Sequence, residues 1–131
     1  MKTPKWVDRR ALILLQGETL AAHGGLPGLR DEGALDASLA RLRHLHAYEP
    51  ESDLPRLAAA YGFGIVRNHP FTDGNKRAGF LSIGLFLARN GRELTAEPVE
   101  AIAVVLRLAG GKMTELELAS WIRQNLDPAQ D

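Results

Sequence analysis

The sequence predicts an all-α protein, a single-domain bundle of about six helices around a central apolar helix. Three observations support this fold class. Apolar residues recur at intervals of three and four along most of the chain, which is the period of an amphipathic helix. No segment shows a strong strand pattern of alternating apolar and polar residues. The 131 residues fit one domain, 1–131, in which we expect 127–131 to be a frayed tail.

The first part of the chain predicts two helices. Trp6–Ala22 carries apolar residues on one face and is followed by the helix-ending pair Gly24-Gly25. Leu26–Asp31 is rich in Gly and Pro and should be a loop, whose last residue can cap the second helix. Leucines repeat every three or four positions over 35–42, in agreement with that helix. His46–Asp53 is polar and has no clear period, so we expect a loop or a short flap.

The middle of the chain predicts two further helices. Asp53 is a good N-cap and Pro55 suits a first turn, so a helix should cover Leu54–Asn68. The run Ala78–Ala88 is apolar on every side, which is typical of a helix surrounded by others, and we expect it to be the central one. Asn90-Gly91 should end it.

Two helices complete the predicted bundle. Pro98 can begin the fifth helix, and the apolar residues of 99–106 fall on one of its faces before Gly110-Gly111 ends it. Thr114 and Glu117 have the spacing of a capping box, which predicts the start of the last helix.

Composition excludes several classes of protein. The 16 Lys and Arg residues balance the 16 Asp and Glu residues, so the chain lacks the basic field that non-specific nucleic-acid binding needs. The absence of cysteine excludes disulfides, thiol catalysis and thiolate metal sites, and it fits a reducing cytoplasm. The N-terminus has no signal-peptide pattern, and the uncharged run 78–88 is too short to span a membrane. We therefore expect a soluble cytoplasmic protein that contacts neither membrane nor nucleic acid.

The stretch His69–Arg77, His-Pro-Phe-Thr-Asp-Gly-Asn-Lys-Arg, concentrates the chemically active side chains. Pro70 disfavours helix for the residue before it and Gly74 permits unusual backbone angles, so we expect a tight loop between two helices. If a helix begins near Asn75 or Lys76, the backbone N–H groups of 74–76 have no intrahelical partner. With the helix dipole and the two cations of the stretch, they would attract a phosphate group.

Two side chains of the stretch extend this hypothesis. Asp73 would repel a phosphate unless a cation lay between them, and Mg²⁺ commonly binds one carboxylate together with phosphate oxygens. Histidine is the residue type whose unperturbed side chain changes charge near neutral pH, and His69 follows a helix, so it is suited to act as a general base. Each residue alone could have a purely structural role, because helix-end histidines, Asp-Gly turns and exposed Lys-Arg pairs are common. Their occurrence together within nine positions favours a functional site over separate structural roles.

This order resembles the signature of the Fic and death-on-curing (Doc) families, in which His-Pro-Phe-x-Asp/Glu-Gly-Asn is followed by Gly-Arg in the Fic branch and has Lys after the Asn in the Doc branch. The resemblance extends to 25–31, Gly-Leu-Pro-Gly-Leu-Arg-Asp, and to the helix end at 86–91. Lys76 stands where Fic proteins have Gly, and Phe80 stands where they have a second Arg. Both differences favour the Doc branch.

The resemblance implies the toxin component of a type II toxin–antitoxin system. Doc-like toxins transfer the γ-phosphate of ATP to a threonine of elongation factor Tu and so stop translation, and a neighbouring antitoxin restrains them. By position, His69 would accept the proton of the target hydroxyl and Asp73 would hold Mg²⁺. The phosphate-binding positions would be Gly74, Asn75, Lys76 and Arg77, with Pro70 and Phe71 as supporting motif residues.

Other interpretations stay open at this point. A Fic-type AMP transferase would use the same histidine, and a non-catalytic module would only bind a nucleotide or a partner. We expect the antitoxin to offer a disordered C-terminal segment, with 46–53 and 26–31 as candidate docking regions. In related Fic-type folds a segment near 46–53 also lies over the site. His44 and His46 are not expected to bind a metal, since residues two apart lie on different sides of a helix.

Overall fold

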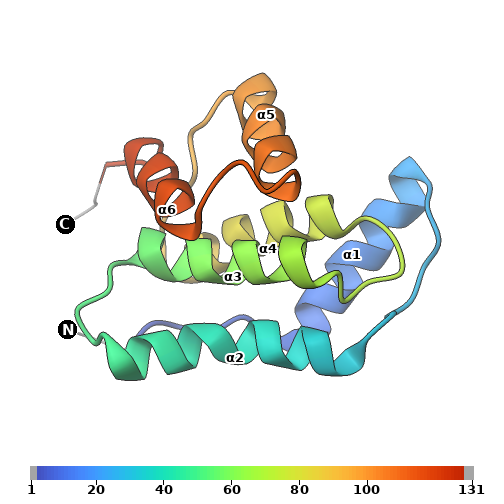
Figure 1. Ribbon diagram of the computed structural model, residues 1–131, viewed down its shortest axis with the longest axis horizontal. Helices are drawn as coiled ribbons and strands as arrows, with labels where there is room; N and C mark the ends of the chain where they lie inside the picture. Colours follow the sequence, from blue (N-terminus) through green and yellow to red (C-terminus); the bar gives the residue numbers. More distant parts are fainter. Residues whose placement is uncertain (1–2, 129–131) are drawn as a thin grey trace.

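Figure 1 shows the computed structural model, in which residues 3–128 are described and form six helices. They are α1 (Arg9–His23), α2 (Glu32–Tyr48), α3 (Leu54–Asn68), α4 (Asn75–Arg89), α5 (Pro98–Ala109) and α6 (Glu115–Gln124). Within residues 3–128 no strand forms, and the only extended pairing is at two isolated antiparallel bridges, Leu29 with Phe71 and Leu94 with Leu126. The predicted all-α fold class is confirmed.

Helix α3 occupies the centre of the bundle. It contacts α2, α4, α5 and α6, and Figure 1 shows it between α2 below and α6 above, with α4 behind. Small residues, among them Ala58, Ala59, Ala60, Gly62 and Gly64, are buried along it and keep it slim enough for neighbours on several sides. A central apolar helix is therefore present as predicted, but it is α3.

The prediction that Ala78–Ala88 is that central helix was wrong. Helix α4 buries one side, and Gly84 and Ala88 on its other side are exposed. The run contains several Gly and Ala residues, whose exposure to water costs little. A helix side made of such residues can therefore face solvent without carrying any charge, and the sequence did not show which side was covered. What α4 does provide is the closest partner of α3, because Gly62 and Gly79 let the two helices meet backbone to backbone.

Most helix boundaries agree with their sequence signals. Asp53 accepts a hydrogen bond from the Arg56 N–H at 3.0 Å and caps α3, and Thr114 with Glu117 forms the predicted capping box of α6. Helix α1 begins at Arg9 rather than at Trp6, since Asp8 is its N-cap. Trp6 instead packs on the Phe86 ring, with centroids 6.4 Å apart.

Helix α2 is longer than predicted. It continues to Tyr48, so His46 and the two residues after it are helical and only 49–53 form the loop. No residue between 43 and 48 interrupts a helix, and the first to do so is Pro50. The His46 ring packs edge-on against Trp6, with centroids 5.7 Å apart.

The segment after α6 turns back toward the end of α4. The Asp127 carboxylate accepts hydrogen bonds from Arg92 Nε at 3.0 Å and from the Glu93 N–H at 3.1 Å. The expected fraying from residue 127 onward is therefore wrong for Asp127 itself, and residues 129–131 lie outside the described part of the chain. These contacts close the bundle at the end of α4 that is opposite to the His69–Arg77 stretch.

Helix α5 exposes the face that its periodicity predicted to be apolar. Val99, Ile102 and Leu106 are 81%, 61% and 55% exposed, whereas Ala101, Val104 and Leu108 point into the core. Both faces of the helix are apolar, so the pattern did not show which one packs. The exposed face is a large apolar surface for so small a protein, and such surfaces commonly bind a partner.

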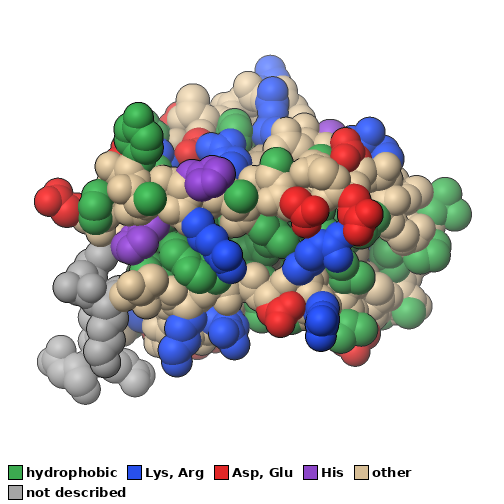
Figure 2. All heavy atoms as spheres, turned by 90° about the horizontal axis from the view of Figure 1, so that it is seen from below, with side chains coloured by type: hydrophobic (Ala, Val, Ile, Leu, Met, Phe, Trp, Pro, Cys, Tyr) green, Lys and Arg blue, Asp and Glu red, His purple; other side chains and the backbone are tan. Residues whose placement is uncertain are grey.

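Charges elsewhere are mixed. On the face seen in Figure 2, basic and acidic side chains are interspersed rather than gathered into a basic patch. The structure thus gives that face no electrostatic footprint for nucleic acid. No helix formed by residues 3–128 is both long and apolar enough to cross a membrane.

Candidate functional site

The His69–Arg77 stretch forms the turn between α3 and α4, as predicted. His69 is the C-cap of α3 in the left-handed conformation, with φ 48° and ψ 57°. It is the only non-glycine residue of 3–128 with a positive φ. Gly74, with φ 72°, is the N-cap of α4, so two left-handed residues bound the loop and reverse the chain between the two helices.

The loop after α1 runs beside this turn and holds it. The Thr72 N–H donates to the Gly28 carbonyl at 3.0 Å, and the N–H groups of Arg30 and Asp31 donate to the Pro70 carbonyl at 2.8 and 3.1 Å. The isolated bridge between Leu29 and Phe71 belongs to the same contact. The two segments that resemble the Fic and Doc families, 25–31 and 69–77, are therefore one structural unit.

Asp73 is oriented by the backbone on both sides. Its Oδ1 accepts the Gly74 N–H at 2.8 Å and its Oδ2 accepts the Leu26 N–H at 3.3 Å. A Cβ atom on Gly25 would lie 3.1 Å from Oδ2, so this position must stay open for the carboxylate to lie where it does. The side chain is exposed, and each oxygen keeps a lone pair for a further ligand.

At the N-terminus of α4, the backbone N–H groups that are available to a ligand are not those of 74–76, as the sequence predicted, but those one residue further on. The Gly74 N–H is occupied by Asp73, whereas the first helical hydrogen bond runs from the Ala78 N–H to the Gly74 carbonyl at 2.8 Å. The N–H groups of residues 75–77 precede that bond and lack helical partners. The available donors are therefore those of Asn75, Lys76 and Arg77.

The Asn75 side chain stabilises the turn through two hydrogen bonds to the backbone of Phe71. Its Oδ1 accepts the Phe71 N–H at 2.9 Å and its Nδ2 donates to the Phe71 carbonyl at 2.9 Å. The amide closes the turn on itself, while Phe71, which is 3% exposed, anchors the turn in the core. The backbone N–H of Asn75 and the second N–H of its Nδ2 group are left to contact a phosphate.

A groove of about 700 Å³ opens beside these donors, between α1, α4 and α5. Its polar end is formed by Asp73, Gly74, Lys76 and Arg77. Its apolar walls are formed by side chains of α1, α4 and α5, including Leu20, Phe80, Ala101, Ile102, Val105 and Leu106. The structure thus gathers in one place four of the predicted site residues and the exposed face of α5.

His69 lies at the side of this arrangement. It lines a separate hollow of about 370 Å³ together with Arg67, Gly110 and Gly111. Its imidazole is exposed and has no hydrogen-bond partner within residues 3–128. A group that reaches both His69 and the end of α4 has to lie over the turn, where the imidazole and the Lys76 side chain are accessible from solvent.

Gln16 is a site residue that the sequence analysis missed. It is 2% exposed and its Nε2 donates to the carbonyls of Asp73 and Gly74 at 2.9 and 3.3 Å. A Cβ on Gly74 would lie 2.7 Å from this nitrogen, so the contact needs glycine there. The signal for it was a polar residue in the buried stripe of α1 between Leu12 and Leu20.

The metal-binding capacity of the turn comes from a single carboxylate. No cluster of three or more His, Cys, Asp or Glu side chains capable of metal binding occurs among residues 3–128, so neither the turn nor α2 forms a cage made of protein ligands alone. Asp73 supplies one carboxylate in the same groove as Lys76 and Arg77. This donor set fits Mg²⁺, which usually takes one or two protein carboxylates and completes its shell with phosphate oxygens and water.

The loop 49–53 does not cover the turn, so the expected flap over the site was wrong for this segment. It lies at the N-terminal end of α3, whereas His69 follows its C-terminal end (Figure 1). The 15 residues of α3 separate them by about 22 Å at 1.5 Å per residue.

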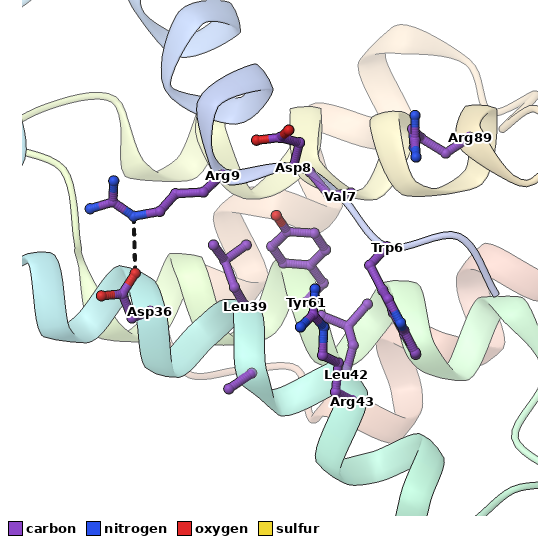
Figure 3. A pocket seen from close by; sticks show the side chains of 11 residues that line it. Trp6, Val7, Asp8, Arg9, Asp36, Leu39, Leu42, Arg43, Tyr61 and Arg89 are labelled. Carbon is purple, nitrogen blue, oxygen red and sulfur yellow. Dashed lines mark hydrogen bonds and ion pairs between the residues drawn. The ribbon is translucent and has the colours of Figure 1, made fainter. Parts of the chain in front are cut away.

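Another hollow, of about 500 Å³, lies between α2 and the residues that precede α1 (Figure 3). Arg9 there is paired with Asp36 at 3.0 Å. The Tyr61 hydroxyl faces it, fully buried and without a hydrogen-bond partner among the described residues. Burial raises the pKa of Tyr61 well above its ordinary value of 10.0, so this hydroxyl stays protonated and is no candidate for a base.

Comparison with known proteins agrees with the motif. Residues 6–87 match the Fic/DOC family. The chain is 34% identical over 118 residues to "Protein kinase doc" of Escherichia phage P1, covering 90% of this chain and 93% of that protein. It is 40% identical over 83 residues to "Toxin Doc" of Mycolicibacterium smegmatis, covering 58% of this chain and 59% of that protein. The chain belongs to the Fic/DOC family, as its motif predicted.

Proposed function

We propose that this protein is a Doc-type toxin that transfers the γ-phosphate of ATP to a hydroxyl of a protein target. The single observation that carries the proposal is the N-terminus of α4, where three backbone N–H groups, Lys76 and Arg77 converge beside Asp73. Similarity along nine tenths of the chain to a relative named a protein kinase supports transfer of phosphate rather than AMP. A threonine of elongation factor Tu is the target that the Doc resemblance implies, and its phosphorylation would inhibit translation.

In this mechanism His69 accepts the proton of the target hydroxyl as its oxygen bonds to the γ-phosphorus. The bond between that phosphorus and the bridging oxygen breaks, and ADP leaves. The N–H groups of 75–77, with Lys76 and Arg77, hold the phosphate oxygens and stabilise the charge that spreads over them. When bound, Mg²⁺ adds positive charge to the phosphates, and Asp73 is the residue that would hold it.

Lys76 is the residue that would decide which phosphate of ATP faces His69. A glycine here would leave room for the phosphates to run past the turn, with the α-phosphate facing His69. The lysine fills that room with a compact charge, and we infer that it retains the chain of phosphates with the γ-phosphate toward His69. Phe80, half-buried in the groove wall, offers no second cation to bind a nucleotide in the Fic orientation.

The test uses ATP labelled separately at the α- or the γ-phosphate. The wild-type protein should label purified elongation factor Tu, or one dominant protein of a bacterial lysate, from the γ position only. His69→Ala should lose about 10²-fold or more of this rate, because a general base typically contributes 10²–10⁴-fold. It should keep its melting temperature, since His69 is exposed.

Each remaining outcome has a distinct meaning. Transfer of α-label by the wild-type protein would establish a Fic-type AMP transferase instead. No labelled protein in either experiment would favour a non-catalytic module. Lys76→Gly should abolish γ-labelling, and Arg10→Ala is the control, because Arg10 is an exposed cation of α1 whose side chain makes no hydrogen bond within residues 3–128.

We also propose that an antitoxin docks in the groove between α1, α4 and α5, through a segment that folds on binding. The apolar face of α5 offers Ile102 and Leu106 to such a segment, and Lys76 and Arg77, which form no ion pair within residues 3–128, offer charges to an acidic residue of it. A segment seated there would cover the phosphate site, which explains inhibition. The two regions expected from the sequence serve less well, because 26–31 is engaged with the turn and 46–53 is remote from it.

The docking proposal is tested with the protein encoded by the neighbouring upstream reading frame. Ile102→Asp should weaken its binding in calorimetry by about tenfold or more, because a buried apolar contact would be replaced by an unpaired charge. Leu116→Asp is the control, since Leu116 is equally exposed, at 63%, but lies on α6 outside the groove. Equal affinity of both variants would place the partner elsewhere.

A further inference from the structure

His69 has a backbone conformation that its own sequence does not favour. A left-handed φ of 48° is uncommon for a residue with a side chain, and the last carbonyls of α3 have no hydrogen-bond partner within the helix. The His69 N–H still completes the helix by donating to the Ile65 carbonyl at 3.2 Å. A contact from outside α3 must therefore stabilise the reversal of the chain direction that follows His69.

The side chain of Arg30 supplies that stabilisation. Its Nε donates to the His69 carbonyl at 2.8 Å and its Nη2 donates to the Asn68 carbonyl at 3.0 Å. The backbone N–H of the same residue donates to the Pro70 carbonyl at 2.8 Å. One arginine thus holds three successive carbonyls, and the planar guanidinium suits the two that project from the end of the helix.

No acidic side chain competes for this guanidinium. Arg30 forms no ion pair within residues 3–128, and the neighbouring Asp31 is engaged as the N-cap of α2, accepting the Ala34 N–H at 3.0 Å. The negative end of the α3 dipole adds to the attraction. The arginine is therefore committed to the end of α3.

The consequence concerns the direction of the imidazole. No hydrogen bond to the His69 ring occurs among the described residues, so the ring is aimed by the backbone that carries it. A rotation of the peptide planes on either side of His69 would move its Cβ atom and the ring with it. Catalysis is sensitive to such shifts, since a displacement of 1 Å can cost about 10²-fold in rate.

We propose that Arg30 is a positioning residue that fixes the backbone of His69 and thereby aims its imidazole at the target hydroxyl. The catalytic consequence rests on the function proposed above, whereas the conformational one does not. Neither the Asp73 carboxylate nor the N–H groups of α4 contact the Arg30 side chain, so binding of ATP does not depend on it.

The kinetic test compares Arg30→Ala with Arg30→Lys, and uses Arg10→Ala as the matched control on an exposed helix face. Arg30→Ala should lower kcat for γ-phosphate transfer about tenfold or more, with the KM for ATP unchanged within about twofold. Arg30→Lys should recover part of this loss, because its ammonium can reach one carbonyl but offers no planar pair of donors. Arg10→Ala should behave as wild type.

The conformational test does not require activity. The carbon chemical shifts of His69 report its φ and ψ, and in NMR spectra they should indicate the left-handed conformation in wild type and a different average in Arg30→Ala, at a temperature where the variant is fully folded. If the wild-type protein transfers no phosphate, the proposed function fails while this comparison still decides the role of Arg30. Wild-type kcat together with wild-type His69 shifts in Arg30→Ala would overturn the inference, and so would a loss of kcat that only mirrors global unfolding.

Discussion

The close contact between α3 and α4 predicts opposite changes in stability when two glycines of α4 are replaced by alanine. Gly79 faces α3 and Gly84 faces solvent. Replacing Gly79 by Ala should destabilise the protein, while the same replacement at Gly84 should stabilise it. The pair isolates the effect of packing, because both positions have ordinary helical φ values and the chemical change is identical.

The magnitude follows from the space around each position. A Cβ on Gly79 would lie 2.4 Å from Val66 Cγ2 and 3.1 Å from the Gly62 carbonyl oxygen, both too close for carbon. Val66 is β-branched and 2% exposed, so it has no free rotamer to take, and the helices must separate. Overpacking of this kind costs about 1–3 kcal/mol, against about 1 kcal/mol gained from helix propensity. The net loss should be about 1 kcal/mol.

A Cβ on Gly84 would have no other atom within 4 Å, so alanine there meets open space. It should keep the full propensity gain of about 0.5–1 kcal/mol. The two variants should therefore differ by about 2 kcal/mol in the free energy of unfolding. A difference of this size is easily resolved.

The assay is urea unfolding followed by far-UV circular dichroism, with the slope m compared between variants. An unchanged m would show that a shift in midpoint is a shift in stability. Because α3 and α4 carry His69 and the anion site at adjoining ends, Gly79→Ala should also lower γ-phosphate transfer under conditions where it is fully folded. Equal or greater stability of Gly79→Ala relative to wild type would refute the close backbone contact.

Three further variants test other contacts. Gln16→Leu should lose about 1 kcal/mol of stability and bind Mg²⁺-ATP more weakly in calorimetry, because the Asp73 and Gly74 carbonyls lose their buried donor; unchanged affinity would separate Gln16 from the site. Tyr61→Phe should be as stable as wild type or more stable by about 1 kcal/mol in thermal unfolding, since it removes a buried hydroxyl that has no partner among the described residues; a large loss would reveal a partner. Hydrogen bonding from Arg123 is the main cause that lowers the pKa of Asp53 below 3.8, so their pair stabilises the fold above that pH and ceases to do so as the pH falls through the lowered value. Arg123→Ala should therefore cost at most about 1 kcal/mol at pH 7, for a half-exposed pair, and the difference from wild type should shrink as the pH is lowered below 3.8; a constant difference would contradict the linkage.

The ends of helices were predicted well where the residues that end them, such as N-caps, glycines and prolines, lie at the end itself. The bounds of α3 agreed with the N-cap Asp53 and with Pro70, which follows its C-cap, and those of α4 agreed with Gly74 and Asn90. Periodicity was less informative, because it shows which residues share a face without showing whether that face is covered. This is why the exposed face of α5 was expected to pack. The run 78–88 was assigned to the centre for another reason, because it has no charged side to indicate which face meets water.

The site shows the same division between local and distant information. The order of residues from His69 to Arg77 predicted a turn between two helices, which the structure forms, and a phosphate site at the start of the second helix, which stays a prediction. It did not predict what holds the turn, because those contacts come from far along the chain. Gln16 is 57 positions from Asp73, and Arg30 is 39 positions from His69.

These distant contacts divide the protein into two parts with different tasks. The turn at 69–74 takes its shape from α1 and from the loop 25–31, and all of these lie within residues 6–87, which match the family. Helix α5 lies outside that match, and it presents to the groove the exposed apolar face on which we propose the antitoxin docks. On the proposals above, the turn and its supports would form one unit, while the exposed face of α5 would select the partner. Ile102 and Leu106 are exposed, so they can change without altering the core side of α5, where Ala101, Val104 and Leu108 are buried. Lys76 and Arg77 would serve both the reaction and the antitoxin, whereas Ile102 and Leu106 would set the affinity for the antitoxin without touching the residues proposed for the reaction.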